Sequence, residues 1–115
     1  AGWAGGPGRE RRVAELRGAG KPVFVAFTAA WWVTCQYNKR TTLADAGVMA
    51  DFAARGVVLM RADWTRRDAA ITAALAGFGR SGVPVYALYG TDGGPPQILS
   101  EILSVREVRD ALARL

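Results

Sequence analysis

The stretch Thr28-Ala29-Ala30-Trp31-Trp32-Val33-Thr34-Cys35 follows the apolar run Pro22-Val23-Phe24-Val25-Ala26-Phe27 and opens a segment with helical character. A strand that feeds a helix N-terminus, with a sulfur close to the junction, favours an activated thiol. The reason is that backbone N–H groups and the helix dipole stabilise a thiolate there. Yet Cys35 is the only cysteine, and Trp32 occupies the helix start, where an attacking thiol would stand.

The 115 residues, half of them hydrophobic, predict one domain with a single core. Alternating strand-like and helix-like segments favour an α/β architecture. No segment approaches the roughly 20 apolar residues of a membrane span, and the Gly-rich start lacks the apolar region of a secretory signal. We therefore expect the domain itself to be soluble.

The net charge of +5 and the pI near 10.1 would suit a nucleic-acid partner. The basic residues are scattered, however, and do not alternate with aromatic ones, so no nucleic-acid binding is expected. A single cysteine excludes an intramolecular disulfide, and the absence of histidine removes the commonest base and metal ligand. We expect no metal site, no cofactor and no hydrolase of the Ser-His or Cys-His kind.

Hydrophobic periodicity and turn residues divide the chain into a flexible leader or linker end at residues 1–8 and a domain at residues 9–115. In the first half of the domain we predict a helix at 9–18, a strand at Val23–Phe27, a helix at about Trp32–Ala44 that is broken near Gly47, and a helical piece around Val48 and Phe52. A strand at Val57–Met60 follows, and then a helix from about Asp68, with Thr65 or Arg67 near its cap. The chain ends with a hairpin of Val85–Tyr89 and Gln97–Glu101 and a helix at about Val105–Leu115.

Several stretches occur in an order typical of one family: Lys21-Pro22-Val23-Phe24-Val25, Phe27-Thr28-Ala29, Trp31, Val33-Thr34-Cys35, Ala62-Asp63-Trp64-Thr65 and Phe78-Gly79-Arg80-Ser81-Gly82-Val83-Pro84. Over about residues 9–115 the chain resembles the C-terminal thioredoxin domain of DsbD-type thiol:disulfide interchange proteins. The resemblance implies a thioredoxin-like α/β fold, with a central mixed sheet of about four strands flanked by helices.

In that family the domain lies in the bacterial periplasm at the end of a transmembrane reductase and passes electrons to other thiol proteins. The resemblance therefore implies a periplasmic location, tethered to the inner membrane if the full-length protein has the membrane portion. The implied partners are periplasmic thiol or disulfide proteins, or the membrane portion of its own parent protein.

The family's Trp-Cys-x-x-Cys motif does the chemistry, and this chain departs from it. Trp31 matches the motif tryptophan and Cys35 matches the resolving cysteine, but Trp32 replaces the attacking cysteine. Exchange begins when a thiolate attacks a disulfide sulfur, so its loss stops the cycle at the first step. Ala26 is a second departure, because thioredoxins often carry there a buried Asp that assists deprotonation of the resolving thiol.

Pro84 matches the family's cis-proline, and the backbone of the preceding Val83 is implied to hydrogen-bond a bound peptide. We therefore expect no dithiol reductase activity from this member of an oxidoreductase family, with Cys35 buried and inert. The alternative is a redox-inactive module that binds a peptide or partner through Trp31, Trp32, Val83 and Pro84. Trp32 would then anchor the peptide or fill the groove itself, and an engineered substitution is a third explanation. A disulfide-linked dimer through Cys35 is a weaker idea.

Overall fold

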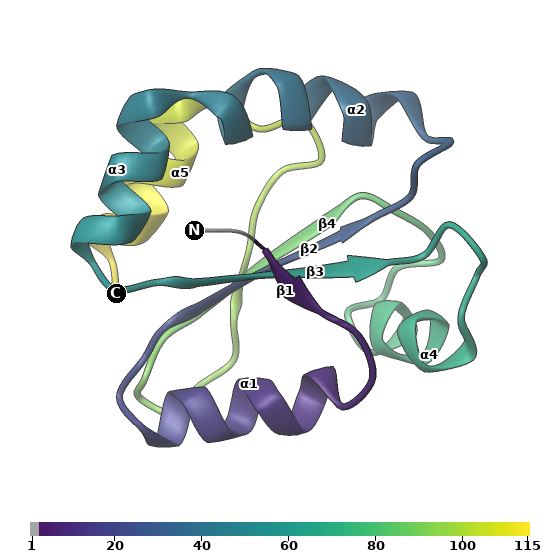
Figure 1. Ribbon diagram of the computed structural model, residues 1–115, viewed down its shortest axis with the longest axis horizontal. Helices are drawn as coiled ribbons and strands as arrows, with labels where there is room; N and C mark the ends of the chain where they lie inside the picture. Colours follow the sequence, from purple (N-terminus) through teal and green to yellow (C-terminus); the bar gives the residue numbers. More distant parts are fainter. Residues whose placement is uncertain (1–2) are drawn as a thin grey trace.

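The strand β2 (Val23–Thr28) lies at the centre of a five-stranded mixed sheet in this computed structural model, which describes residues 3–115 (Figure 1). On one side β2 pairs in parallel with β3 (Val58–Asp63), and β3 pairs in parallel with β1 (Ala4–Gly5). On the other side β2 is antiparallel to β4 (Val85–Tyr89), which pairs with β5 (Gln97–Ile98). The chain therefore has the thioredoxin-like α/β fold expected from the sequence.

The apolar run of β2 explains its central place. Its residues from Val23 to Phe27 are all buried, as a strand with covered faces requires. In the register of the sheet, Ala26 lies between Arg61 of β3 and Tyr86 of β4. Phe27 pairs with Val85, so the segment that follows β2 and the segment that precedes β4 lie at the same end of these two strands.

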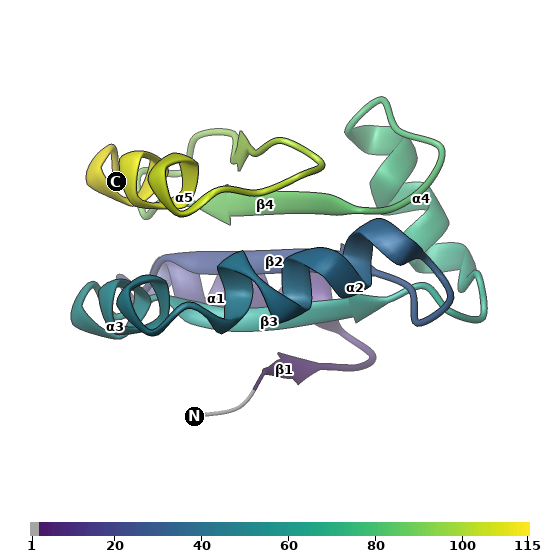
Figure 2. The ribbon, with the colours of Figure 1, turned by 90° about the horizontal axis from the view of Figure 1, so that it is seen from above.

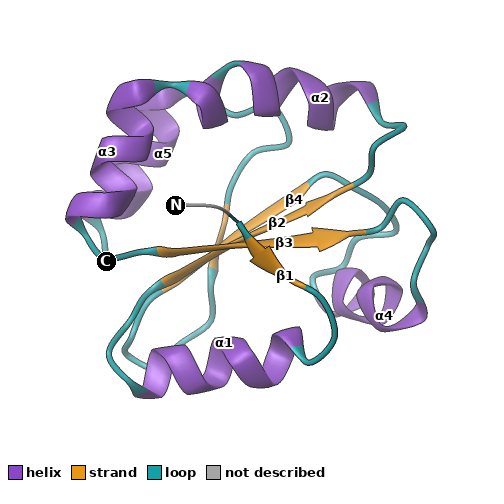
Figure 3. Cartoon of the chain, in the orientation of Figure 1, coloured by secondary structure: helices purple, strands orange, loops and turns teal. Residues whose placement is uncertain are grey.

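Helices cover both faces of the sheet (Figure 3). One face packs against α1 (Arg9–Gly18) and α4 (Ala69–Gly77), and the other against α2 (Val33–Arg40), α3 (Ala46–Ala54) and α5 (Val105–Ala113). Because successive strand residues point to opposite faces, β2 contributes to both cores. Its contributions are Phe24 and Ala26 on the α3 and α5 side and Val23, Val25 and Phe27 on the α1 and α4 side.

The edge strand β1 was not predicted, and the sheet has five strands where about four were expected (Figure 2). Residues 1–2 of the predicted leader lie outside the described residues, but Ala4 and Gly5 pair with Met60 and Arg61, so a flexible leader is wrong for these two. Trp3 packs on the core, with its ring 6.1 Å from that of Phe24. A two-residue strand is too short to show periodicity, which is why the sequence did not indicate it.

The predicted helix at Trp32–Ala44 is interrupted earlier than expected. The helix α2 ends at Arg40, a short 3₁₀ helix spans Thr42–Ala44, and α3 begins where the Asp45 carboxylate accepts a hydrogen bond from the Val48 amide at 2.9 Å. Gly47 lies inside α3, so the break predicted there is wrong.

Two smaller boundaries also differ from the prediction. The cap of α4 is Asp68, whose carboxylate accepts from the Ile71 amide at 3.0 Å, and neither Thr65 nor Arg67 has this role. The strand β5 ends at Ile98, before the predicted Glu101.

A buried asparagine fixes α2 over the sheet. Asn38 is fully buried, and its side-chain amide donates to the Tyr86 hydroxyl at 2.8 Å and to the Glu101 carbonyl at 2.7 Å. Its carbonyl oxygen accepts from the Leu103 amide at 3.0 Å. Burial raises the pKa of Tyr86 to about 12, against the lowering effect of the Asn38 hydrogen bond. The tyrosine therefore stays neutral, and α2 is bonded both to β4 and to the loop before α5.

Replacing Asn38 tests this anchor. We expect Asn38→Ala to lower the free energy of unfolding by roughly 3 kcal/mol, because buried polar partners lose their hydrogen bonds. Urea denaturation followed by circular dichroism gives the value. The control is Arg40→Ala, at an exposed position on the same helix, with an expected change within about 0.5 kcal/mol. Equal stability of the two variants would contradict the anchor.

Candidate functional site

The junction between β2 and α2 places its two distinctive side chains, Trp32 and Cys35, in different environments. Trp32 is the N-cap residue of α2, with extended backbone and no side-chain hydrogen bond to the helix. Its side chain is 44% exposed, whereas Cys35 is 3% exposed. Because the backbone of Trp32 is extended, its side chain does not follow the helical spacing that would place it on the face of Cys35, and the indole is exposed while the sulfur is buried.

The environment of Cys35 makes its thiol a poor nucleophile. Burial raises the pKa of the Cys35 thiol, and hydrogen bonds with the backbone of Ala29 and of Cys35 itself oppose this only in part. Desolvation therefore outweighs the helix N-terminus, which alone would favour the thiolate. The structure thus buries Cys35 as expected, and its inertness stays a prediction.

Neither Ala26 nor Asp63, which line the pocket of Cys35, is suited to act as its base. Ala26, buried on β2, lines the same pocket as Cys35 and carries no titratable group. Asp63 also lines this pocket, but hydrogen bonds from the Thr65 hydroxyl and amide lower the pKa of its carboxyl. A carboxylate stabilised in this way is a weaker proton acceptor.

Three tryptophan side chains pack in a row next to the junction, and we call this group the aromatic ridge: Trp64, Trp31 and Trp32. Trp64 is buried, and its ring centroid lies 6.0 Å from that of Trp31. Trp31, 45% exposed, meets Trp32 edge to face at 6.2 Å. Ring pairs in such geometries contribute favourable energy beyond burial. The aromatic ridge therefore extends from the buried Trp64 to the exposed Trp31 and Trp32.

The loop after β3 holds the ridge in place. The Trp31 indole N–H donates to the Thr65 carbonyl at 2.9 Å, and the Ala30 amide donates to the Thr65 hydroxyl at 2.9 Å. The Arg67 guanidinium lies 5.0 Å from the Trp31 ring and 4.9 Å from the Trp64 ring. The sequence interpretation assigned Thr65 to a helix cap and missed these roles, because nothing local indicates a contact with a distant loop.

Val83 and Pro84 lie at the same end of the sheet as the aromatic ridge, because they precede Val85, which pairs with Phe27. Their peptide bond is cis, Pro84 is buried and Val83 is half-buried. Among residues 3–115, no hydrogen bond engages the backbone N–H or C=O of Val83. These two backbone groups are therefore free to bond an incoming chain.

The pocket, the ridge and the rest of residues 3–115 contain no cluster of three or more His, Cys, Asp or Glu side chains arranged to hold a metal ion. In the same part of the chain, no helix combines the length and the apolar character needed to cross a bilayer.

The strand–helix junction, the mixed sheet and the cis-proline loop define a thioredoxin-like protein. The chain belongs to the thioredoxin-like family, whose sequence model matches residues 8–91. No curated protein sequence matches it.

Solved structures resemble this one over nearly its whole length. The oxidised C-terminal domain of Neisseria meningitidis DsbD has 20% identity and a TM-score of 0.74, with 99% of this chain and 98% of that chain covered. The reduced form has 19% identity and a TM-score of 0.73, covering 92% and 91%. A thioredoxin from Thermus thermophilus has 19% identity and a TM-score of 0.74, covering 99% and 87%. At these identities the likeness establishes the fold.

The reactivity of Cys35 should depend on unfolding. Its raised pKa means that at any given pH the folded chain holds less thiolate than the unfolded chain, so alkylation should be slower when folded and should accelerate only above the ordinary thiol range near 8.5. Mass spectrometry after iodoacetamide treatment, with and without urea, measures both rates across pH. Equal rates at neutral pH would show that the sulfur is neither buried nor perturbed.

Proposed function

We propose that this chain is a DsbD-type interchange domain that no longer carries out dithiol exchange and has kept its partner-binding face. The observation that carries this is the position of Trp32 at the start of α2, with the only thiol, that of Cys35, buried one turn further on. Exchange needs one thiolate to attack a disulfide and a second thiol to resolve the mixed disulfide. Cys35 alone supplies neither an exposed attacker nor a pair.

The DsbD-type assignment has two supports. The motif stretches between Lys21 and Pro84 resemble that family, and two similar structures are C-terminal domains of DsbD. A periplasmic location belongs to the same proposal, with periplasmic thiol or disulfide proteins, or the membrane portion of a parent protein, as partners. A domain that catalyses no thiol–disulfide exchange would still bind these partners.

Restoring the missing groups tests the loss of exchange. We expect the unmodified chain to reduce no disulfide substrate, Trp32→Cys to gain measurable turnover, and Trp32→Cys combined with Ala26→Asp to be at least about tenfold faster, because a positioned base assists proton removal. Oxidation of a coupled reductant follows the rate. Tyr37→Cys, which adds an exposed thiol elsewhere on α2, is the matched control and should stay silent.

Turnover by the unmodified chain at the rate of the double variant would remove the proposal of lost exchange. If neither Trp32→Cys variant reduces the disulfide substrate, the chain lacks more for exchange than the thiol at position 32 and the carboxylate at position 26.

The binding role rests on a second observation. The exposed rings of Trp31 and Trp32 lie at the sheet edge where the backbone of Val83 is free of internal hydrogen bonds. An extended peptide could bond to Val83 as an added strand and place an apolar side chain on Trp32. Exposed aromatic side chains next to free backbone groups are typical anchors of such interfaces. We propose that Trp32 is the anchor of this site.

Peptide titration shows whether Trp32 binds the peptide or fills the groove itself. With a dye-labelled heptapeptide that carries one central Phe and no cysteine, fluorescence anisotropy should show saturable binding, and Trp32→Ala should weaken it on the order of tenfold. The control is Leu115→Ala, an exposed apolar residue against Gly90 at the opposite end of β4. Tighter binding by Trp32→Ala would show that Trp32 fills the groove, and an unchanged affinity would remove the anchor.

A further inference from the structure

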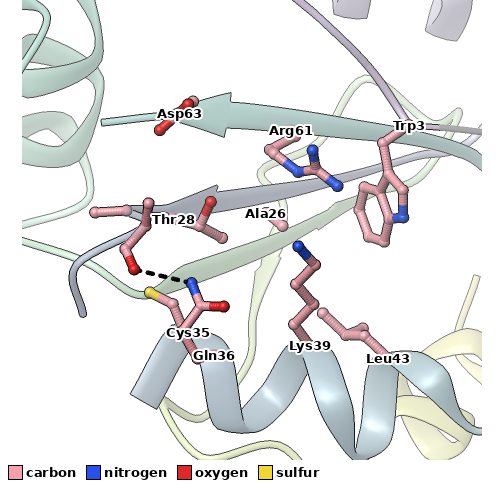
Figure 4. Close-up of a pocket in the computed structure, with 11 residues that line it drawn as sticks. Trp3, Ala26, Thr28, Cys35, Gln36, Lys39, Leu43, Arg61 and Asp63 are labelled. Atoms are coloured by element: carbon pink, nitrogen blue, oxygen red, sulfur yellow. Dashed lines mark hydrogen bonds between the residues drawn. The ribbon is translucent and has the colours of Figure 1, made fainter. Parts of the chain in front are cut away.

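The pocket that Cys35, Ala26 and Asp63 line lies between α2 and the sheet and extends from the junction as far as Trp3 (Figure 4). Its volume is about 170 Å³. Three layers of the structure contribute to it: Trp3 comes from the segment before β1, Ala26 and Arg61 come from the paired strands β2 and β3, and Lys39 comes from α2. The pocket is therefore assembled by the fold from distant parts of the chain.

Two cationic side chains converge on this pocket. In Figure 4 the amine of Lys39 and the guanidinium of Arg61 both point into the space beside the Trp3 ring. The guanidinium lies 5.7 Å from the centre of that ring. None of the ion pairs formed within residues 3–115 includes Lys39 or Arg61. Both side chains are exposed, and Arg61 interacts with the Asp63 carboxylate only at a distance longer than that of an ion pair.

The lining also contains one acidic side chain, Asp63, so its two cations outnumber its carboxylates by one. Asp63 lies at the opposite end of the pocket from Trp3 in Figure 4. Its Oδ1 already accepts hydrogen bonds from the hydroxyl and the amide of Thr65. Opposite Arg61 in the sheet register stands Ala26, which has no charge. The end of the pocket that contains Lys39, Arg61 and Trp3 is therefore positive.

The same end of the pocket is apolar on its other sides. Ala26, Leu43 and the Trp3 ring supply carbon surface next to the two cations. The whole pocket, with its Asp63 end included, has a volume of about 170 Å³, close to the roughly 150 Å³ of engineered protein cavities that accept benzene. Such a combination fits a ligand with one negative group and one small apolar group.

We infer that this pocket binds a small organic anion, with a carboxylate or phosphate between Lys39 and Arg61 and an apolar group of about the size of a benzene ring against Trp3, Ala26 and Leu43. The carboxylate or phosphate accepts hydrogen bonds from the ammonium and the guanidinium, which are stronger than neutral ones because both partners are charged. The pocket requires no redox step, and its ligand need not touch the aromatic ridge.

Titration of the whole chain with benzoate and with phenyl phosphate tests the assignment, with the Trp3 indole N–H followed by NMR at constant ionic strength. We expect saturable shifts with a dissociation constant on the order of 1 mM. Lys39→Gln and Arg61→Gln should each weaken binding roughly tenfold. The matched controls Lys21→Gln and Arg12→Gln, at exposed positions outside the pocket lining, should leave it unchanged.

Two further probes separate the parts of the ligand. Benzamide, which is neutral, should bind at least about tenfold more weakly than benzoate if the cations select the ligand. Inorganic phosphate should bind more weakly than phenyl phosphate if the apolar wall contributes. Non-saturable shifts, or equal affinities across Lys39→Gln, Arg61→Gln and the control variants, would overturn the inference. Inorganic phosphate that binds as tightly as phenyl phosphate would overturn the apolar half of it.

Discussion

The hydrogen bonds of Asn38 are the constraint on which the functional end of the molecule depends. They join α2 to Tyr86 in β4 and to the backbone at Glu101 and Leu103, so the helix cannot rotate or slide without breaking buried bonds. With α2 fixed in this way, the start of the helix also has one orientation. That orientation places Trp32 in solvent and Cys35 inside the molecule.

Redox chemistry and recognition depend on largely different residues at this junction. Exchange requires an exposed thiolate and a nearby base, and the chain has Trp32 where the DsbD-type motif has its attacking cysteine and Ala26 where thioredoxins often carry a buried Asp. The aromatic ridge depends instead on Thr65 and Arg67, which hold Trp31 from the neighbouring loop. Position 32 is common to both, because Trp32 replaces the attacking cysteine and also belongs to the aromatic ridge, so the change that removes the thiol adds an exposed ring to the surface.

The central strand and the order of elements could be predicted because continuous apolar runs and turn residues are local signals. The burial of Cys35 also followed from its place one turn into a helix. The strand β1 could not be predicted, since two residues show no periodicity, and the bonds of Asn38 could not, since an isolated asparagine on a helix gives no sign of its distant partners. The same applies to Thr65, and to the pocket that brings Lys39 and Arg61 together, because each arises from tertiary contacts.

The central claim is that no disulfide can be attacked by this molecule in its folded state. The most direct measurement is intact-mass spectrometry of the folded chain after incubation with an excess of an aromatic disulfide, with circular dichroism to show that the fold persists. We expect the mass to stay unchanged until denaturant is added, when one adduct forms on Cys35. A stoichiometric mixed disulfide on the folded chain at neutral pH would contradict it.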